Sequence, residues 1–440
     1  MIRDQQPTAF RYTRRALMCQ GLLAAWGISS LTACSNGLLD FTPHAEAEKT
    51  RSSSTVIANP ATTNALLAAN LDFSFRLQNV LLKSSSAENL FFSPLSISTA
   101  LDMVYNGATS TTRQAMATAL GLQALSQTNV NAAVLSILNG LRERDPKITL
   151  SIADSIWLRK DLVAVPNFIT ALQTYYNAVL YNLDFSNPQA PDIINTWVKN
   201  QTHGLIPSII TNIDQAALMY LINALYFKAP WRVPFSTNAT QPGAFTTSTG
   251  KTITIPMMSK ESSFLYAQSD TTEMIQLPYG AGKMSMYIVL PAKNSSLKAL
   301  LSNLDATYWN ALLKTLTQRH GTIQLPKFTV TYEVGLKDAL TTLGMGLAFD
   351  PHKATFPSMI KGQPHVCISE VKHKATMKID EYGTLAAAVT SIEMVGAALS
   401  LDNFNMVVNR PFFCAIRDDV TGTLLFVGAI VDPSQQSASA

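Results

Sequence analysis

Cys34 is the residue whose surroundings indicate a defined reaction. It follows an apolar stretch, residues 16–33, that ends in Leu-Thr-Ala and is preceded by several arginines. This order is typical of a bacterial signal peptide with a lipoprotein cleavage box, in which the cysteine thiol takes up a diacylglyceryl group. We therefore expect residues 1–33 to be removed and a lipid on Cys34 to anchor the exported protein in the cell envelope, in the periplasm or at the outer membrane or cell surface.

Two alternatives stay open at this terminus. An ordinary secretory signal peptide with an incidental cysteine has the same general pattern. The pair Arg14-Arg15 also resembles a twin-arginine export motif, so the sequence does not decide between the two export routes.

The composition excludes several functions for the rest of the chain. Its 440 residues are 47% hydrophobic and 14% charged, which is enough for one large domain or two ordinary ones. Removing residues 1–33 takes away four arginines and one aspartate, so the formal charge falls from +4 to +1. A nearly neutral protein gives no electrostatic reason to expect nucleic acid as a partner.

The remaining reactive side chains form no catalytic or metal-binding pattern. The six histidines lack metal-ligand spacing, no glycine-rich phosphate loop is present, and no pairing of a nucleophile with a base supports a hydrolase. We therefore expect no metal and no cofactor. Cys414, in the apolar run PFFCAI, is predicted to be a buried free thiol rather than half of a disulfide.

Residues 381–400, EYGTLAAAVTSIEMVGAALS, have the composition of a segment that can be either a loop or a strand. Read with a period of two, one face of an extended chain carries Thr384, Ala386, Ala388 and Thr390. Such small side chains would let this strand pass between two others. A core helix or an alanine-rich linker would fit the composition as well.

Four other segments make that interpretation specific. They are NLFFSPLSISTALDMVYNGATSTTRQAM (89–116), ALMYLINALYFKAPWRVPF (217–235), HKATMKIDEYGT (373–384) and NRPFFCAIRDDVTGTLLFVGAIVDP (409–433). In this order and at these separations they resemble the serpins, a family of protease inhibitors. The resemblance covers about residues 61–433.

The resemblance implies an α+β fold of about eight to nine helices around three β-sheets. It also implies an exposed reactive loop, about residues 381–405, that can insert into the central sheet. The chain would then consist of a signal peptide (1–33), a lipidated tether (34–60), the serpin domain (61–433) and a flexible tail (434–440). We expect a monomer.

Particular residues acquire roles from the resemblance. The loop hinge would consist of Glu381, Gly383, Thr384, Ala386, Ala387 and Ala388. The residues that control opening of the sheet would be Ser93, Ser96, Asn223, His373, Trp231 and Lys327. Asn223 and His373 are expected to share a hydrogen bond, and Lys327 to pair with Glu381. For the two serines, helix capping is the plain alternative. Ala229 departs from the glycine usual in the family.

The implied function is irreversible inhibition of serine endopeptidases, in which the protease cleaves the loop, forms an acyl-enzyme and is trapped when the loop inserts. Family spacing from Glu381 sets the reactive bond at Ala397-Ala398, which would suit an elastase-like or subtilisin-like protease; Leu399-Ser400 is the alternative. A non-inhibitory binding protein, whose affinity for a ligand changes on loop cleavage, is the other function considered. The basic residues Arg142, Arg144 and Lys147 are predicted to be a solvated face, so no polyanion cofactor is expected.

Apolar periodicity predicts the elements that position these residues. Helices are expected over 62–83, 130–141, 166–176, 193–201 and 297–313, with a further helix that starts at Pro94 and stops at Asn106-Gly107-Ala108. Strands are expected over 148–158, 253–258, 274–277, 283–290 and 323–331, and residues 217–235 begin as a strand buried on both faces.

Overall fold

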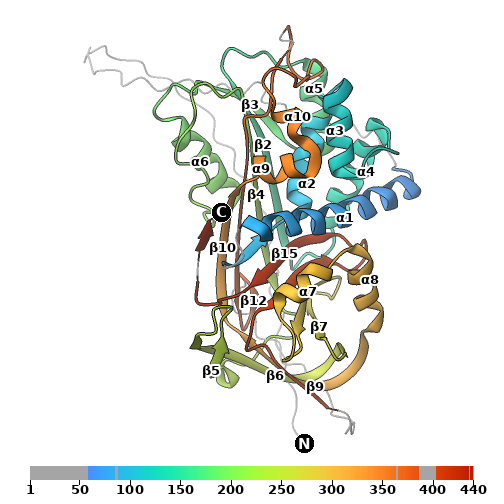
Figure 1. Cartoon of the computed structure of the whole chain (residues 1–440), viewed down its shortest axis with the longest axis vertical. Coiled ribbons are helices and arrows are strands. Elements are labelled where there is room, and N and C mark those ends of the chain that lie inside the picture. Colours follow the sequence, from blue (N-terminus) through green and yellow to red (C-terminus); the bar gives the residue numbers. More distant parts are fainter. Residues whose placement is uncertain (1–57, 85–87, 363–364, 386–402, 436, 440) are drawn as a thin grey trace, which may run out of the picture. The chain divides into compact units, whose positions relative to one another are not determined.

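The computed structural model describes residues 58–84, 88–362, 365–385, 403–435 and 437–439 (Figure 1). All of them belong to one compact unit, Thr50–Ala440. Among these residues, no helix has both the length and the apolar character needed to cross a bilayer. The predicted signal peptide, Cys34 and most of the predicted reactive loop lie outside the described residues.

A seven-stranded sheet carries the candidate site. Its strands, in spatial order, are β16 (Ser437–Ser439), β10 (Phe328–Gly335), β11 (Glu370–Asp380), β12 (Gly383–Thr384), β4 (Met219–Pro230), β2 (Thr149–Arg159) and β3 (Val179–Leu183). β4 is antiparallel to β2 and parallel to β11. Its near-continuous apolar sequence is buried because the sheet is covered on both faces.

The other strands form one nine-stranded sheet. Along its main path lie β1 (Leu90–Phe92), β15 (Leu424–Ile430), β14 (Phe412–Asp418), β8 (Met284–Pro291), β7 (Thr272–Tyr279), β6 (Thr252–Gln268), β9 (Thr317–Pro326) and β13 (Phe404–Val407), and β5 (Gln241–Thr246) pairs with β6. The sequence predicted three sheets in all. The described strands form two, because the long strand β6 pairs with β5, β7 and β9 at once.

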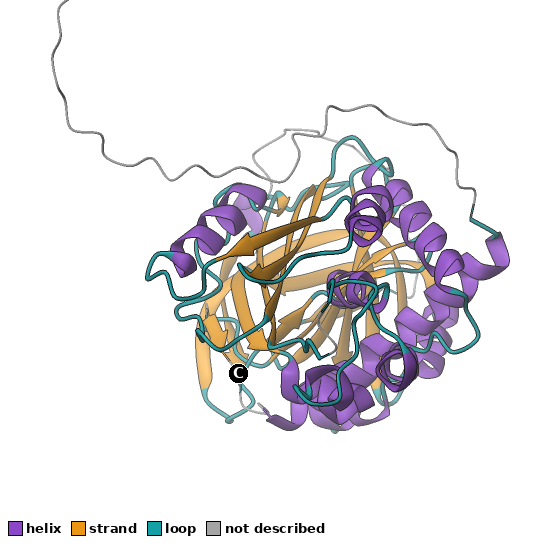
Figure 2. Cartoon of the chain, turned by 90° about the horizontal axis from the view of Figure 1, so that it is seen from above, coloured by secondary structure: helices purple, strands orange, loops and turns teal. Residues whose placement is uncertain are grey.

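Helices surround these sheets (Figure 2). They are α1 (Pro60–Ser84), α2 (Pro94–Tyr105), α3 (Ser110–Leu120), α4 (Gln127–Arg142), α5 (Pro166–Ala171), α6 (Ala190–Gln201), α7 (Leu297–Asn303), α8 (Ala306–Thr315), α9 (Lys337–Leu340) and α10 (Gly346–Phe349). α2 begins at Pro94, as predicted, and is buried along its whole length. The α+β fold is thereby confirmed.

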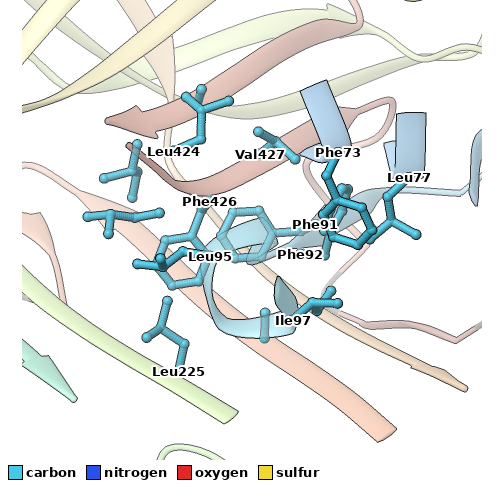
Figure 3. Packing of buried hydrophobic residues seen from close by; sticks show 14 of the residues in the cluster. Phe73, Leu77, Phe91, Phe92, Leu95, Ile97, Leu225, Leu424, Phe426 and Val427 are labelled. Carbon is cyan, nitrogen blue, oxygen red and sulfur yellow. The ribbon is translucent and has the colours of Figure 1, made fainter. Parts of the chain in front are cut away.

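The hydrophobic core joins α1 and α2 to strands of both sheets (Figure 3). Phe91 of β1 stacks on Phe426 of β15, with ring centroids 5.0 Å apart. Leu95 of α2 and Leu225 of β4 lie in the same cluster. Because α2 is packed into this core, its N-terminus is a fixed support under the seven-stranded sheet.

Two predicted elements are each divided in the structure. Residues 323–331 were expected as one strand, but β9 ends at Pro326 and β10 begins at Phe328 in the other sheet. Proline cannot donate a ladder hydrogen bond, so the chain leaves the first sheet there. Residues 297–313 were expected as one helix, but α7 ends at Asn303 and Asp305 caps α8 by accepting a hydrogen bond from the Tyr308 N–H at 2.7 Å.

The end of the chain also differs from the prediction. Residues 434–440 were expected to be a flexible tail, yet Ser437–Ser439 form β16, which pairs in parallel with Thr331–Glu333 of β10. β10 lies next to the edge of the sheet, and a small-residue segment can satisfy its backbone groups without steric conflict.

Candidate functional site

The hinge of the predicted loop is already part of the seven-stranded sheet. Gly383 pairs with Asp380 of β11 on one side and with Pro230 of β4 on the other. Thr384 likewise pairs with Ile379 and Ala229. Gly383 and Thr384 therefore form a short strand between β11 and β4.

Gly383 is needed here for a steric reason. Its φ is +144°, and a Cβ atom added to it would lie 2.2 Å from the carbonyl oxygen of Ala229. Any L side chain would collide with the β4 backbone. The resemblance implied only that Gly383 is a hinge residue, whereas the structure requires glycine there for the close approach of two strands.

The side chain of Thr384 is buried and hydrogen-bonded. Its side chain is 1% exposed, and its hydroxyl lies 2.6 Å from the hydroxyl of Tyr279 at the end of β7. The Tyr279 ring stacks on Trp231 with centroids 4.5 Å apart. Trp231 in turn donates from its indole N–H to the carbonyl of Asp380 at 2.9 Å. These contacts join Thr384, within the seven-stranded sheet, to Tyr279 of the nine-stranded sheet.

The chain turns out of the sheet at Leu385. Its N–H still donates to the Lys378 carbonyl at 3.2 Å, but its φ is +53°, in the left-handed region. A leucine there is strained by about 1–2 kcal/mol relative to extended backbone. Extension of β12 through Leu385 would release that strain.

Glu381, at the base of the hinge, is fixed by the predicted ion pair. Its carboxylate is 2.8 Å from the Lys327 ammonium and accepts a hydrogen bond from the Thr240 hydroxyl at 2.8 Å. Burial opposes ionisation, but these hydrogen bonds outweigh it and lower the pKa of Glu381. Lys327 reaches this place because it lies at the crossing between β9 and β10.

Three residues on adjacent strands form a row under the hinge: Asp154 on β2, Asn223 on β4 and His373 on β11. Asn223 is the register partner of both others. Its Oδ1 lies 2.6 Å from Nδ1 of His373, and its Nδ2 donates to a carboxylate oxygen of Asp154. The side chains of Asn223 and His373 are fully buried.

Two residues at the N-terminus of α2, Ser93 and Ser96, also contact this row. The Ser93 N–H donates to Nε2 of His373 at 3.1 Å, and Nδ2 of Asn223 donates to the Ser96 carbonyl at 2.8 Å. The Ser93 hydroxyl also caps the helix by accepting from the Ser96 N–H at 3.2 Å. Ser93 thus caps the helix, and the two serines contact β11 and β4 through His373 and Asn223.

β4 and β11 are paired over only part of their length. Their register pairs run from Glu370 to Ala375 on β11 and from Tyr220 to Leu225 on β4. The next residues of β11, Thr376–Lys378, are not paired with β4. At the end of β11 that follows them, β12 lies between the two strands. The described part of the chain thus shows a central sheet that is separated at one end.

Several predicted site residues cannot be placed. Ala386, Ala387, Ala388, Ala397 and Ala398 all lie outside the described residues, as does Cys34. The hinge residues before them, up to Leu385, are described.

The predicted basic face was partly wrong. Arg144 does not belong to a solvated face, because its Nε is 2.9 Å from an oxygen of Asp418, a carboxylate with no exposed surface. Arg142 and Lys147 are exposed. The ion pair of Arg144 joins the segment just after α4 to Asp418, the last residue of β14, so this arginine has a structural partner.

The remaining chemistry of the described residues is simple. No group of histidine, cysteine and acidic residues among them is arranged to hold a metal ion. Cys367 and Cys414 are both free and buried, which confirms the prediction for Cys414. Burial raises the pKa of the Cys414 thiol to about 12, so this thiol is unreactive.

Sequence reasoning missed two residues of this site. Tyr279 is 105 positions from Thr384 in the chain, and nothing in its local sequence indicates the contact. Asp154 could have been found, because it is a carboxylate inside the predicted strand 148–158, where a buried position needs a partner.

A central sheet that holds Gly383 and Thr384 between β11 and β4 is the arrangement that the family resemblance implied. The family profile "Serpin (serine protease inhibitor)" matches residues 68–433, and the chain belongs to the serpin family. Serpins of this class are protease inhibitors and not enzymes.

Individual relatives agree with this assignment. The chain is 31% identical to plasminogen activator inhibitor 1 of Neovison vison, over 82% of this chain and 92% of the relative. It is 33% identical to iripin-3 of Ixodes ricinus, over 85% of this chain and 96% of iripin-3. Among solved structures, native tengpin, a thermophilic serpin, has a TM-score of 0.78 at 31% identity over 86% of this chain and 95% of tengpin. The structure of human thyroxine-binding globulin in complex with thyroxine has a TM-score of 0.79 at 25% identity, over 85% of this chain and 100% of the globulin.

Proposed function

We propose that this serpin inhibits serine endopeptidases irreversibly, by loop cleavage and insertion. The protease serine attacks the loop and forms an ester with the residue before the cut, releasing the new amino terminus that follows. The freed loop then extends β12 down the gap between β11 and β4. The single observation that carries this proposal is that Gly383 and Thr384 already lie in that gap.

β12 defines the register that the inserted loop would adopt. Thr384 pairs with Ile379 and Ala229, antiparallel to both strands. Continued in the same register, Thr390 would lie between His373 and Asn223. These two are register partners before insertion, and their hydrogen bond must break for a strand to enter. The Thr390 hydroxyl can both donate and accept, so it would restore the broken link.

The energetics favour insertion. In this register, residues 385–394 would complete pairing to Met219, the first residue of β4. A central strand gains hydrogen bonds on both sides, whereas opening breaks the pairing of six positions between β4 and β11. At about 1 kcal/mol net for each hydrogen bond, the surplus is on the order of 10 kcal/mol.

The register also predicts how far the reactive bond lies beyond the end of the inserted strand. A cut after Ala397 would leave three residues beyond position 394, roughly 10 Å at about 3.3 Å per residue. An attached protease would then be pressed against the far end of the sheet, where its catalytic groups would be distorted and deacylation would stall. Alanine before the cut favours an elastase-like or subtilisin-like target.

Replacement of Thr384 by arginine tests the insertion step. Thr384→Arg puts a charged side chain where the native one is 1% exposed, so insertion should fail and the protease should cleave the variant as a substrate. Thr254→Arg, at an exposed position of β6, is the matched control and should inhibit normally. Unchanged inhibition by Thr384→Arg would refute the mechanism.

We also propose that the mature protein is a lipoprotein of a bacterial envelope, attached through Cys34. The lipoprotein box before Cys34 supports this proposal. Mass analysis of the N-terminal peptide from a bacterial host should show a diacylglyceryl group on Cys34, absent in Cys34→Ser. An unmodified cysteine, or cleavage elsewhere, would contradict it.

A second candidate function is small-molecule binding. A cavity of about 930 Å³ lies between α1 and α7, lined by Leu82, Leu297 and Leu301, by the cations Lys83, Lys298 and Arg410, and by the carboxylate of Glu88. Such a lining suits a largely apolar molecule with charged groups, and thyroxine, the ligand of one structural relative, is a suitable probe. Calorimetric titration of uncleaved and loop-cleaved protein with thyroxine should show binding that Leu301→Trp abolishes; absence of heat in both forms would exclude this candidate.

A further inference from the structure

The C-terminal tail, residues 434–440, lies beyond the family profile, which ends at residue 433. Three of its residues, Ser437–Ser439, form β16 along Thr331–Glu333 of β10, and the described end of the chain lies beside that strand (Figure 1). Among the described strands, β10 has β11 on its other side, so β16 is the edge strand of the sheet. The seventh strand is therefore supplied by residues that the family profile does not contain.

One buried side chain, Asn89, fixes the direction in which the chain leaves β15. Asn89 directly precedes β1 and is 1% exposed. Its Oδ1 accepts hydrogen bonds from the N–H groups of Val431 and Asp432, at 2.8 and 3.0 Å. Its Nδ2 donates to the carbonyls of Asp432 and Gln435, at 2.7 and 3.2 Å. Both polar ends of this amide thus hold the chain just after β15.

Residues 432–435 form a turn that leads the chain to β10. The Asp432 carboxylate accepts from the N–H and the hydroxyl of Ser434, at 2.9 and 2.6 Å. The Gln435 N–H donates to the Asp432 carbonyl at 3.2 Å. An aspartate that bonds the backbone two residues ahead is a common turn former. Because Asn89 and Asp432 determine this path, the pairing of β16 with β10 follows from a defined turn.

β10 itself lacks the features that usually protect an edge strand. Proteins prevent such edges from pairing with other chains by placing charges, proline or a bulge there. β10, FTVTYEVG, has no proline, and it pairs with β11 without interruption over all eight residues. Its one charged side chain, Glu333, forms an ion pair with Lys374 at 2.7 Å. Without β16, the free N–H and C=O groups of β10 would be open to pairing with another extended chain.

A second copy of this chain is the partner that fits this edge. Two β10 strands related by a two-fold axis would pair antiparallel through the same residues, and two-fold contacts of this kind are the commonest in homo-oligomers. Six of the eight residues are β-branched or aromatic, the types that favour strand pairing. β16 pairs at only three positions, but its short connection to β15 gives it an effective concentration on the order of millimolar. The tethered strand therefore wins over a second copy in dilute solution.

We propose that β16 is an intramolecular cap on the edge of β10, and that this edge is a self-association surface for a second copy of the chain when the cap is absent. The tail thereby keeps this serpin monomeric. The inference does not depend on inhibition, because the oligomeric state is measured without a protease.

The test compares the chain from Ser35 to Ala440 with a chain that ends at Gln435, which keeps the residues that Asn89 and Asp432 contact but lacks β16. Analytical ultracentrifugation over a series of concentrations gives the oligomeric state. The full chain should remain a monomer, and the shortened chain should form dimers as its concentration rises. In the dilute shortened chain, at least one backbone N–H of Thr331–Glu333 should exchange at least about tenfold faster than in the full chain. The same N–H should be protected again in the dimer.

Two variants of the full chain separate the backbone of β16 from its side chains. Ser437→Pro together with Ala438→Pro removes two adjacent N–H groups, one of which faces β10 in an extended strand, and should give the same dimers. Ser437→Ala together with Ser439→Ala keeps every N–H and should stay monomeric. If the shortened chain does not fold, the proline variant gives the same comparison.

Three results would overturn the proposal. The shortened chain stays monomeric at every concentration, or the full chain dimerises as readily. Exchange in β10 is equally slow in both dilute chains. Dimers form, but Thr331–Glu333 exchanges as fast in them as in the dilute chain, or protection appears instead on β3, the opposite edge of the same sheet, because association would then use another surface.

Discussion

The hydroxyl of Thr384 lies 2.6 Å from that of Tyr279, and this contact joins the start of the reactive loop to the nine-stranded sheet before any cleavage. Tyr279 is itself held by stacking on Trp231. In the mechanism proposed above, Gly383 and Thr384 would therefore be the point from which insertion continues, because they already lie between β11 and β4.

Tyr279→Phe should weaken the contact between Thr384 and the nine-stranded sheet. The variant keeps the ring stack but loses the hydrogen bond to Thr384, so the free energy of unfolding should fall by about 1 kcal/mol. Slower insertion should also let more inhibitor be cleaved for each protease trapped. Tyr266→Phe removes another buried tyrosine hydroxyl, bonded to Glu273 and remote from the hinge, and is the control. If both variants trap protease with wild-type stoichiometry, the contact has no part in insertion.

Gly383→Ala should expel β12 from the sheet. The added methyl group would meet the Ala229 carbonyl at 2.2 Å, in addition to the strain of a positive φ. Gly204→Ala, at φ +81° with no atom within 4 Å of the new Cβ, measures that strain alone, about 1–2 kcal/mol. Proteolysis within the hinge should become faster in Gly383→Ala only. Equal resistance of the hinge to proteolysis in the two variants would contradict the close approach of Gly383 to the Ala229 carbonyl.

Thr390→Val should destabilise the loop-cleaved protein but not the intact one. The register of β12 sets Thr390 between Asn223 and His373 only after insertion, and valine of similar shape would leave their polar atoms unpaired, at about 1–3 kcal/mol. Thermal unfolding of both forms measures the difference. Ser391→Ala, on the opposite face of the strand, should have little effect. An equal loss of thermal stability in intact and cleaved Thr390→Val would show that the inserted loop does not follow the register of β12.

The stability of the protein should depend on pH through Asp154. Burial raises the pKa of its carboxyl to about 7, and the hydrogen bond from Asn223 and the charge of Arg142 oppose that shift only in part. Between about pH 4 and pH 7 the folded protein keeps a proton that the unfolded chain has lost, so the free energy of unfolding falls as pH rises. Urea unfolding across this range should show a smaller slope in Asp154→Asn; identical slopes would contradict the shift.

The sequence allowed one local part of the site to be predicted: Pro94 indicated the start of α2, because a helix start depends on residues close together in the chain. The hinge residues around Glu381 were predicted only through the family resemblance, and their pairing as β12 was not predicted. The ion pair of Lys327 with Glu381 was also predicted, through resemblance alone.

Long-range geometry was outside the reach of the sequence. Tyr279 and Arg144 obtain their roles from partners on distant strands, Thr384 and Asp418, which no periodicity reveals. The division of residues 323–331 depends on Pro326 ending one ladder just where the next sheet offers another. Likewise, the small residues at the C-terminus are unremarkable in sequence but find free backbone groups beside β10.

The most direct test of the central claim is to mix the chain from Ser35 onward with pancreatic elastase, trypsin and subtilisin, separate the products under denaturing conditions, and determine the mass of the released C-terminal peptide. We predict a covalent complex with elastase or subtilisin that resists denaturant, and a peptide that begins at Ala398. Complete cleavage of the loop by all three proteases, with no covalent complex, would contradict the proposal that this serpin traps its target.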